Sequence, residues 1–243
     1  MFEIFTKKSQ KFTFMISIYR KRINFLKKVF RCHGIPFPNI FSGNLKVDNS
    51  CFNSPYYCTL SHYNVIKNAA EKQFPYVIIF EDDVIPKKNI MKKIELFCNE
   101  FNKNFEYESC DLLKLETCEF NEVGNFQEKY GQKFETYYKF NKSVVANYIP
   151  TYGTGAYIVF RKAYEEMLKK LEESLFSGQF FPVDHFYKYD LNMTITSPLL
   201  FAQYPEIESG KQPFGMDTFN FRRTDDSSDH DLDIIEKLKA SVI

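Results

Sequence analysis

The sequence predicts an α/β fold in which a mostly parallel central sheet is flanked by helices. Short apolar runs alternate along the chain with segments whose apolar residues recur at helical spacing. The clearest run, Val77 to Phe80, is β-branched at three of its four positions, which is typical of a strand buried on both faces. A length of 243 residues suits one large domain with a small appendage. We place the domain at residues 1–210 and a polar tail or short helical appendage at residues 211–243.

The first half of the chain predicts two strands and two helices before this run. The segments 11–19 and 37–41 are strand candidates, and the residues between them have helical periodicity that ends at Gly34. A loop rich in Asn, Ser and Gly covers 42–55, and a helix is expected over 57–73.

The second half continues the alternation of elements. Its expected elements are a helix over 90–101, a strand over 111–116, a hairpin or mobile loop over 121–143, a strand-like stretch over 144–160 broken by Pro150 and a Gly-Thr-Gly sequence, a helix over 163–175, and a late strand over 193–204.

Three adjacent acids, Glu81, Asp82 and Asp83, follow the apolar run directly. At the end of a buried strand they repel one another and lose solvation, so something must offset that cost. Carboxylate oxygens suit magnesium or manganese, and in open α/β sheets the ligand crevice lies at the carboxyl ends of the strands. The acids therefore predict a metal or nucleotide site. The alternative is that they cap a helix starting near Pro86.

Composition narrows the function classes. The formal net charge of +1 gives no support to a nucleic-acid-binding surface. The six cysteines form no C-x-x-C pair, and no signal peptide or membrane-spanning stretch is apparent, so we expect a cytoplasmic protein. Basic residues cluster near the N-terminus; this face could touch the inner membrane of a bacterium, or simply be a solvated helix face.

Four blocks of the sequence resemble glycosyltransferase family 25, which includes lipooligosaccharide galactosyltransferases and collagen galactosyltransferase domains. The blocks span about residues 12–210 in the family's order. They are Ile16-Ser17-Ile18 with Arg20 and Arg22, Cys58 to His62, Ile78 to Val84, and Gly153 to Tyr157 followed by Pro182-Val183-Asp184. The chain departs from the pattern at Tyr57, where the family usually has Gly, and its arginines follow the first strand sooner than usual.

The resemblance implies a GT-A-like (Rossmann-like) fold, a UDP-sugar donor and a manganese or magnesium cofactor. The implied reaction is transfer of a hexose, with galactose as the leading candidate, to a saccharide or glycolipid acceptor with inversion. The implied process is the synthesis of bacterial lipooligosaccharide, lipopolysaccharide or another surface glycan. Two alternatives remain. One is a catalytically silent nucleotide-sugar- or glycan-binding module on the same fold. The other is a metal-dependent phosphohydrolase, although the spacing of Asp82, Asp83 and Val84 does not suit its two-aspartate motif.

The candidate site residues follow from the acids and the resemblance together. Side chains at i and i+2 of a strand share a face, so Asp83 is the expected first metal ligand with Glu81 beside it, and Asp82 is a second candidate. Asp184 is the candidate general base for the acceptor hydroxyl, or else a helix N-cap. The expected nucleotide-sugar-binding residues are Ser17, Arg20, Arg22, Ser61, His62, Glu81, Asp82, Gly153, Thr154 and Gly155. Each of the arginines, the Ser61-His62 pair and the glycine turn also has an ordinary structural explanation, as surface charge, local helix hydrogen bonds or a simple turn.

Overall fold

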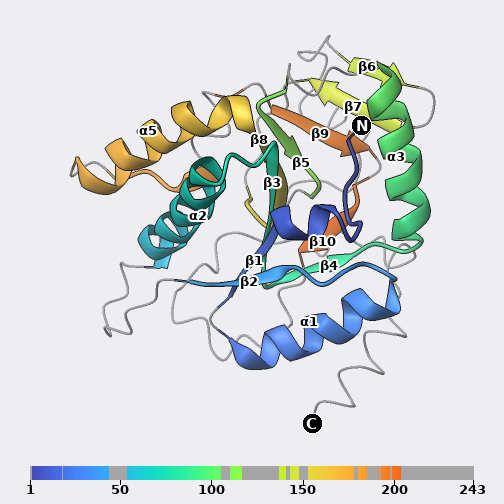
Figure 1. Cartoon of the computed structure of the whole chain (residues 1–243), viewed down its shortest axis with the longest axis horizontal. Helices are drawn as coiled ribbons and strands as arrows, with labels where there is room; N and C mark the ends of the chain where they lie inside the picture. The colour runs from blue at the N-terminus through green and yellow to red at the C-terminus, as the bar shows by residue number, and fades with distance from the viewer. Residues whose placement is uncertain are drawn as a thin grey trace, which may run out of the picture.

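A central sheet of eight strands organises the chain (Figure 1). The computed structural model describes residues 2–17, 19–43, 54–104, 110–116, 137–140, 143–147, 153–177, 180–184, 191, 193–197 and 199–203. The strands, in spatial order, are β2 (Asn39–Ser42), β1 (Thr13–Ser17), β3 (Tyr76–Glu81), β8 (Ala156–Phe160), β5 (Leu112–Lys114), β9 (Met193–Ser197), β7 (Ser143–Asn147) and β6 (Tyr137–Phe140).

The sheet is mixed in its pairing but largely uniform in direction. The pairs β2–β1, β1–β3 and β5–β9 are parallel, whereas β8 is antiparallel to both β3 and β5, and β7 is antiparallel to both β9 and β6. Only β8 and β7 therefore run against the other strands of this described sheet. A second, two-stranded antiparallel sheet joins β4 (Val84–Pro86) to β10 (Phe201–Gln203).

Helices cover the sheet on both faces. In Figure 1, α2 (Ser54–Glu71) and α5 (Tyr164–Phe176) lie together on one side, and α3 (Ile90–Asn104) lies on the other. The helix α1 (Arg20–Cys32) follows β1, and short 3-10 turns span Ser9–Phe12 and Arg161–Ala163. Within the described residues we find no helix with the length and apolar character that a membrane crossing requires.

The alternation of side chains along β3 explains why its run is apolar throughout. Val77 and Ile79 belong to the core under α2 and α5, whereas Ile78 and Phe80 belong to the core on the opposite face. All four side chains are fully buried. Because successive residues of a strand point to opposite faces, a strand covered on both sides needs apolar residues at every position.

The α/β class predicted from the sequence is confirmed, with some differences at the element boundaries. The segment 144–160 forms two strands, β7 and β8, and the segment 193–204 forms β9 and β10 in different sheets. The strand expected over 37–41 lies at Asn39–Ser42. Strand β6 and Ser143, the first residue of β7, fall within the expected hairpin over 121–143. The tail at 211–243 lies outside the described residues.

One interpretation of the acids is wrong. They do not cap a helix near Pro86, because Val84–Pro86 is strand β4 and α3 begins only at Ile90. Val84 and Ile85 are buried and pair with β10, so an extended conformation there buries apolar side chains that a helix start would have exposed.

Candidate active site

Three chain segments meet at the carboxyl end of β3. Because β8 runs antiparallel to β3, with Phe80 opposite Ala156, the Gly153-Thr154-Gly155 turn that precedes β8 lies beside the acids. Strand β5 is antiparallel to β8, so its own carboxyl end reaches the same edge, where the backbone N–H of Leu115 donates to the carbonyl of Ala156 at 2.9 Å. The topology thus collects polar groups from distant parts of the sequence at one sheet edge.

Asp82 joins this edge to the start of α1. The Ser17 hydroxyl donates to Asp82 Oδ2 at 2.5 Å, and Arg22 Nη1 donates to Asp82 Oδ1 at 2.8 Å. The parallel register that places Ile16 opposite Glu81 brings Ser17 next to Asp82. Ser17 and Arg22, both expected to bind the donor, therefore meet Asp82 instead of projecting separately, while Arg20 is exposed.

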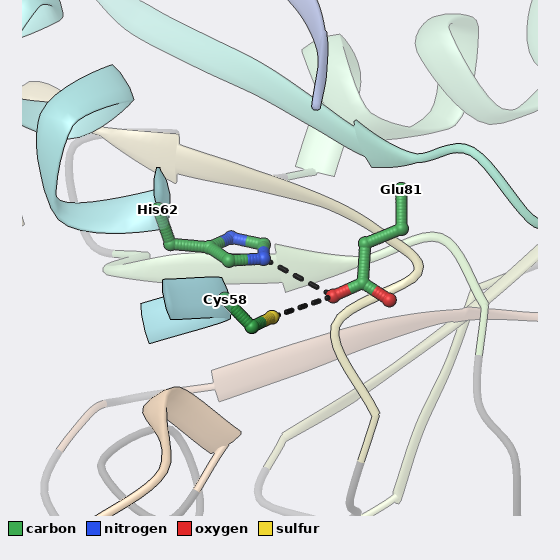
Figure 2. A group of neighbouring side chains, drawn as sticks. All are labelled: Cys58, His62 and Glu81. Atoms are coloured by element: carbon green, nitrogen blue, oxygen red, sulfur yellow. Dashed lines mark hydrogen bonds and ion pairs between the residues drawn. The ribbon is translucent and has the colours of Figure 1, made fainter. Parts of the chain in front are cut away.

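Glu81 turns towards α2 rather than towards α1 (Figure 2). Its Oε1 accepts hydrogen bonds from His62 Nε2 at 3.1 Å, from Cys58 Sγ at 3.5 Å and from the Thr154 hydroxyl. Burial alone would raise the pKa of Glu81, but the hydrogen bond and charge of His62, with the hydrogen bonds of Thr154 and Cys58, outweigh burial and hold it below its ordinary value. Glu81 is therefore a fixed, ionised carboxylate.

His62 lies behind Glu81, away from solvent. Its side chain has no exposed surface, its Nδ1 lies 2.5 Å from the Tyr157 hydroxyl, and the two rings stack. Ser61 is also buried and donates its hydroxyl to the Tyr57 carbonyl at 2.7 Å, one turn earlier in the helix. His62 thus joins α2 to Glu81, and Ser61 bonds within its own helix.

The Gly-Thr-Gly turn is held at both ends by β5. Lys114 Nζ donates to the Gly153 carbonyl at 2.7 Å, and Glu116 Oε1 accepts from the Gly155 N–H at 3.0 Å. Gly153 has a φ of 98°, which favours glycine. With both flanking residues held, the Thr154 hydroxyl is presented to Glu81.

Gly155 should not tolerate a side chain. A Cβ at this position would lie 2.6 Å from Val84 Cγ1 and 3.0 Å from the Glu116 carboxyl group. We expect Gly155→Ala to lower the free energy of unfolding by about 1–3 kcal/mol, the usual cost of overpacking, as measured by urea denaturation. Because Val84 makes the closest contact, adding Val84→Ala should recover part of the Gly155→Ala loss in a double-mutant cycle. Strictly additive losses would contradict this explanation.

Glu116 is a second buried acid at this edge. Its side chain is fully buried, and among the described residues its Oε2 has no hydrogen-bond partner. Burial raises its pKa, the charge of Lys114 opposes that rise, and the charge of Glu81 adds to it. A carboxyl group with a raised folded-state pKa takes up a proton on folding, so the stability it contributes is present below its ordinary pKa and is lost as pH rises through the folded value.

Glu116→Gln should therefore flatten the pH dependence of stability. Glutamine keeps an oxygen acceptor for the Gly155 N–H but does not titrate. Above the ordinary carboxyl pKa of 4.5, the free energy of unfolding should fall more steeply with pH in the parent chain than in Glu116→Gln. Urea titrations of both proteins across this range measure the two slopes. Parallel slopes would show that Glu116 titrates alike in the folded and unfolded chain.

Asp184 follows a segment whose backbone is held by hydrogen bonds to α2 and α5. The Val183 N–H donates to Thr59 Oγ1 of α2 at 3.1 Å, and the Ser174 hydroxyl bonds both the N–H and the carbonyl of Phe181 at 2.8 Å. Asp184 is half-buried, and its charge is among those that raise the pKa of Cys58, after burial and Glu81. Residues 185–190, which a capping role would involve, lie outside the described part of the chain.

Asp83 is half-buried and lies in the turn between β3 and β4, so the strand alternation from which its i, i+2 relation to Glu81 was predicted does not extend to it. Burial is the largest cause of the raised pKa of the Cys58 thiol, and the charge of Asp83 adds to it. Both oxygens of Asp82 are engaged by Ser17 and Arg22. The carboxylates of Asp83 and Glu81 fit a hard divalent cation by their chemistry.

Several residues that build the site were not anticipated from the sequence. Tyr157, Thr59 and Lys114 each hold a predicted site residue or its neighbour in place. Lys114 and Glu116 had a detectable signal, because both are charged residues after the apolar Leu112-Leu113 in DLLKLE. Tyr157 and Thr59 lie inside two of the blocks that resemble the family, but their contacts depend on which elements the fold brings together.

The fold and the polar groups at the end of β3 indicate a class of enzyme. Fixed carboxylates and a glycine turn at the carboxyl end of a buried α/β strand are typical of enzymes that bind a nucleotide or a metal-bound phosphate. The chain belongs to glycosyltransferase family 25: the model described as "Glycosyltransferase family 25 (LPS biosynthesis protein)" matches residues 3–187, well over half of its length. A comparison with curated proteins gave no match.

Three solved structures resemble the chain at low identity. A glycosyltransferase involved in the glycosylation of the major capsid of PBCV-1 is 10% identical, with a TM-score of 0.41 over 81% of this chain and 93% of that one. A protein from STIV is 15% identical, with a TM-score of 0.40 over 79% and 84%. Mouse xyloside xylosyltransferase 1, in its apo form, is 11% identical, with a TM-score of 0.33 over 72% and 79%.

Proposed function

We propose that this family 25 glycosyltransferase transfers a hexose from a UDP-sugar to a saccharide or glycolipid acceptor, and that galactose is the leading candidate for the hexose. The transfer would proceed with inversion and would use manganese or magnesium as cofactor. The observation that carries the proposal is Glu81 at the end of β3, where His62, Cys58 and Thr154 hold its carboxylate next to Asp82 and Asp83 in a chain of this family. Family membership supplies the reaction class and its association with lipopolysaccharide synthesis.

The metal would be held by Asp83, with Glu81 beside it, and would neutralise the diphosphate as the sugar–phosphate bond breaks. Glu81 suits this position because His62, Thr154 and Cys58 hold it in one orientation and keep it ionised. Asp82, by contrast, fixes the end of β3 to α1 through Ser17 and Arg22. Arg20 is exposed, so a diphosphate could meet its guanidinium.

Asp184 is the proposed general base. It would accept the proton from the acceptor hydroxyl as that oxygen attacks the anomeric carbon, and a single displacement of this kind inverts the anomeric configuration. The Val183–Thr59 and Phe181–Ser174 hydrogen bonds fix the backbone on which Asp184 is carried. A base that must meet two substrates in one geometry benefits from such fixation.

A thermal-shift screen of UDP-sugars with manganese identifies the donor. A ligand that binds the folded chain stabilises it by mass action, so the true donor should give the largest shift, and EDTA should abolish it. Transfer or hydrolysis of that donor then separates an enzyme from a silent binding module, which would show the shift without turnover. Full transferase activity in EDTA would overturn the metal requirement.

The basic N-terminal region supports a peripheral membrane contact within the cytoplasm. Helix α1 exposes five basic side chains: Arg20, Lys21, Lys27, Lys28 and Arg31. We expect the chain to cosediment with anionic phospholipid vesicles at low salt and to be released as salt screens the attraction. Binding to neutral vesicles as strong as to anionic ones would contradict this contact.

A further inference from the structure

A cysteine, a histidine and a glutamate converge at the carboxyl end of β3 (Figure 2). Cys58 and His62 are four residues apart on α2 and therefore share one face of the helix. That face meets Glu81 at the end of β3. Cys58 Sγ, His62 Nε2 and a Glu81 carboxylate oxygen all lie within 4.8 Å of one another.

We propose that Cys58, His62 and Glu81 bind a zinc ion, with Glu81 contributing the Oε1 atom that faces Cys58 and His62, at a site distinct from the donor metal that Asp83 would hold. Zinc–sulfur bonds of about 2.3 Å and zinc–nitrogen or zinc–oxygen bonds of about 2.0–2.1 Å, at tetrahedral angles, separate the ligand atoms by roughly 3.3–3.6 Å. The observed separations are 3.5 Å for Sγ to Oε1 and 3.1 Å for Nε2 to Oε1. Small side-chain movements would therefore make room for the ion.

The donor set selects zinc over the hard cations. A thiolate and an imidazole suit zinc, whereas magnesium and manganese prefer oxygen ligands. Three protein ligands leave a fourth tetrahedral position, which water could fill. Binding would release two protons to solvent, the Cys58 thiol proton and the His62 Nε2 proton that faces Glu81, and the neutral imidazole would keep its remaining ring proton on Nδ1.

Tyr157 provides the outer partner that a zinc-bound histidine normally has. A histidine that binds zinc through one ring nitrogen usually donates the other N–H to a neighbouring acceptor, which fixes the tautomer and the ring orientation. The Tyr157 hydroxyl lies 2.5 Å from His62 Nδ1, and its ring stacks on the imidazole. The ring is thus held with Nε2 directed at Glu81.

The Glu81 carboxylate places a negative charge beside the thiol, since its Oε1 lies 3.5 Å from Cys58 Sγ. A divalent cation would offset that charge and stabilise the thiolate it binds.

Metal competition in solution tests the site directly. The full chain is stripped with a chelator, dialysed and titrated with zinc against a chromophoric zinc chelator. We expect one equivalent of zinc to bind, with an affinity reduced by at least about 100-fold in Cys58→Ser and by about 10- to 100-fold in Tyr157→Phe. Cys98→Ser, which removes another half-buried thiol, is the matched control and should bind as the parent chain does. Failure of the parent chain to bind zinc, or undiminished binding by Cys58→Ser, would overturn the site.

Alkylation of the cysteines provides a second test on the unsubstituted chain, so its result does not depend on whether a variant folds. Iodoacetamide labelling is followed residue by residue by mass spectrometry, with and without zinc. Zinc should slow the alkylation of Cys58 while the exposed Cys32 reacts at an unchanged rate. Equal protection factors at Cys58 and Cys32 would contradict the proposal.

The site is distinguishable from the proposed transferase metal. Asp83→Asn should retain zinc, because Asp83 is not one of the three ligands. Loss of zinc in Asp83→Asn as complete as in Cys58→Ser would instead assign all binding to the diphosphate-associated metal and would overturn a separate site. Transfer assays with manganese are a different experiment, so either conclusion can fail while the other stands.

Discussion

Asp184→Asn should reduce kcat by roughly 10²- to 10⁴-fold while leaving UDP–manganese binding nearly unchanged. An amide cannot accept the acceptor's proton, but it keeps the size of the carboxylate and should preserve the pinned segment around Val183. The loss should therefore appear in turnover and not in the affinity for UDP, which isothermal calorimetry measures separately.

The control for Asp184→Asn is Asp111→Asn. Asp111 lies at the start of β5, at the opposite sheet edge, where it pairs with Lys162 at 2.8 Å. Its loss removes a partly exposed ion pair and should leave turnover within a few-fold of the parent chain. If Asp184→Asn abolishes UDP–manganese binding, Asp184 is a metal ligand or a structural residue, and Glu116 becomes the next candidate base at this edge.

Asp83→Asn should have the second large effect, which is a loss of affinity for manganese and UDP. A neutral amide is a poor ligand for a hard cation, so manganese and UDP should lose affinity together, and turnover should fail as a consequence. Calorimetric titration of UDP with and without manganese measures both losses in one protein.

Asp82→Asn provides the contrast for Asp83→Asn. Asp82 is tied to Ser17 and Arg22, so its substitution should lower stability more than it lowers manganese affinity. If Asp82→Asn removes manganese binding and Asp83→Asn does not, the assignment of the two neighbours must be exchanged.

The β3 strand and its acids could be predicted because the signal is local. A continuous apolar run bounded by charges has few structural solutions, and both the burial of Val77 to Phe80 and the position of Glu81 at the strand end follow from it. Sequence patterns were not sufficient to predict strand β4. Three residues, Val84–Pro86, form a strand only because β10, more than a hundred residues later, pairs with them.

The partners of the acids could not be predicted for the same reason. Sequence spacing placed Glu81 and Asp83 on one face, but nothing local indicates that Glu81 faces α2 while Asp82 faces α1. That divergence depends on the register between β1 and β3 and on the reversed direction of β8, which brings Thr154 against Glu81. His62, a predicted donor-binding residue, contacts Glu81 in the same way, because α2 lies beside the end of β3.

Metal-dependent glycosyl transfer is tested most directly by UDP release from the best-binding UDP-sugar by the full chain, measured with manganese, with EDTA, and with manganese in Asp83→Asn. We expect manganese-dependent UDP release that EDTA abolishes, that a saccharide acceptor accelerates, and that Asp83→Asn loses. UDP release that is equally fast in EDTA, or a chain that consumes no UDP-sugar across the panel, would contradict a metal-dependent glycosyl transfer at the end of β3.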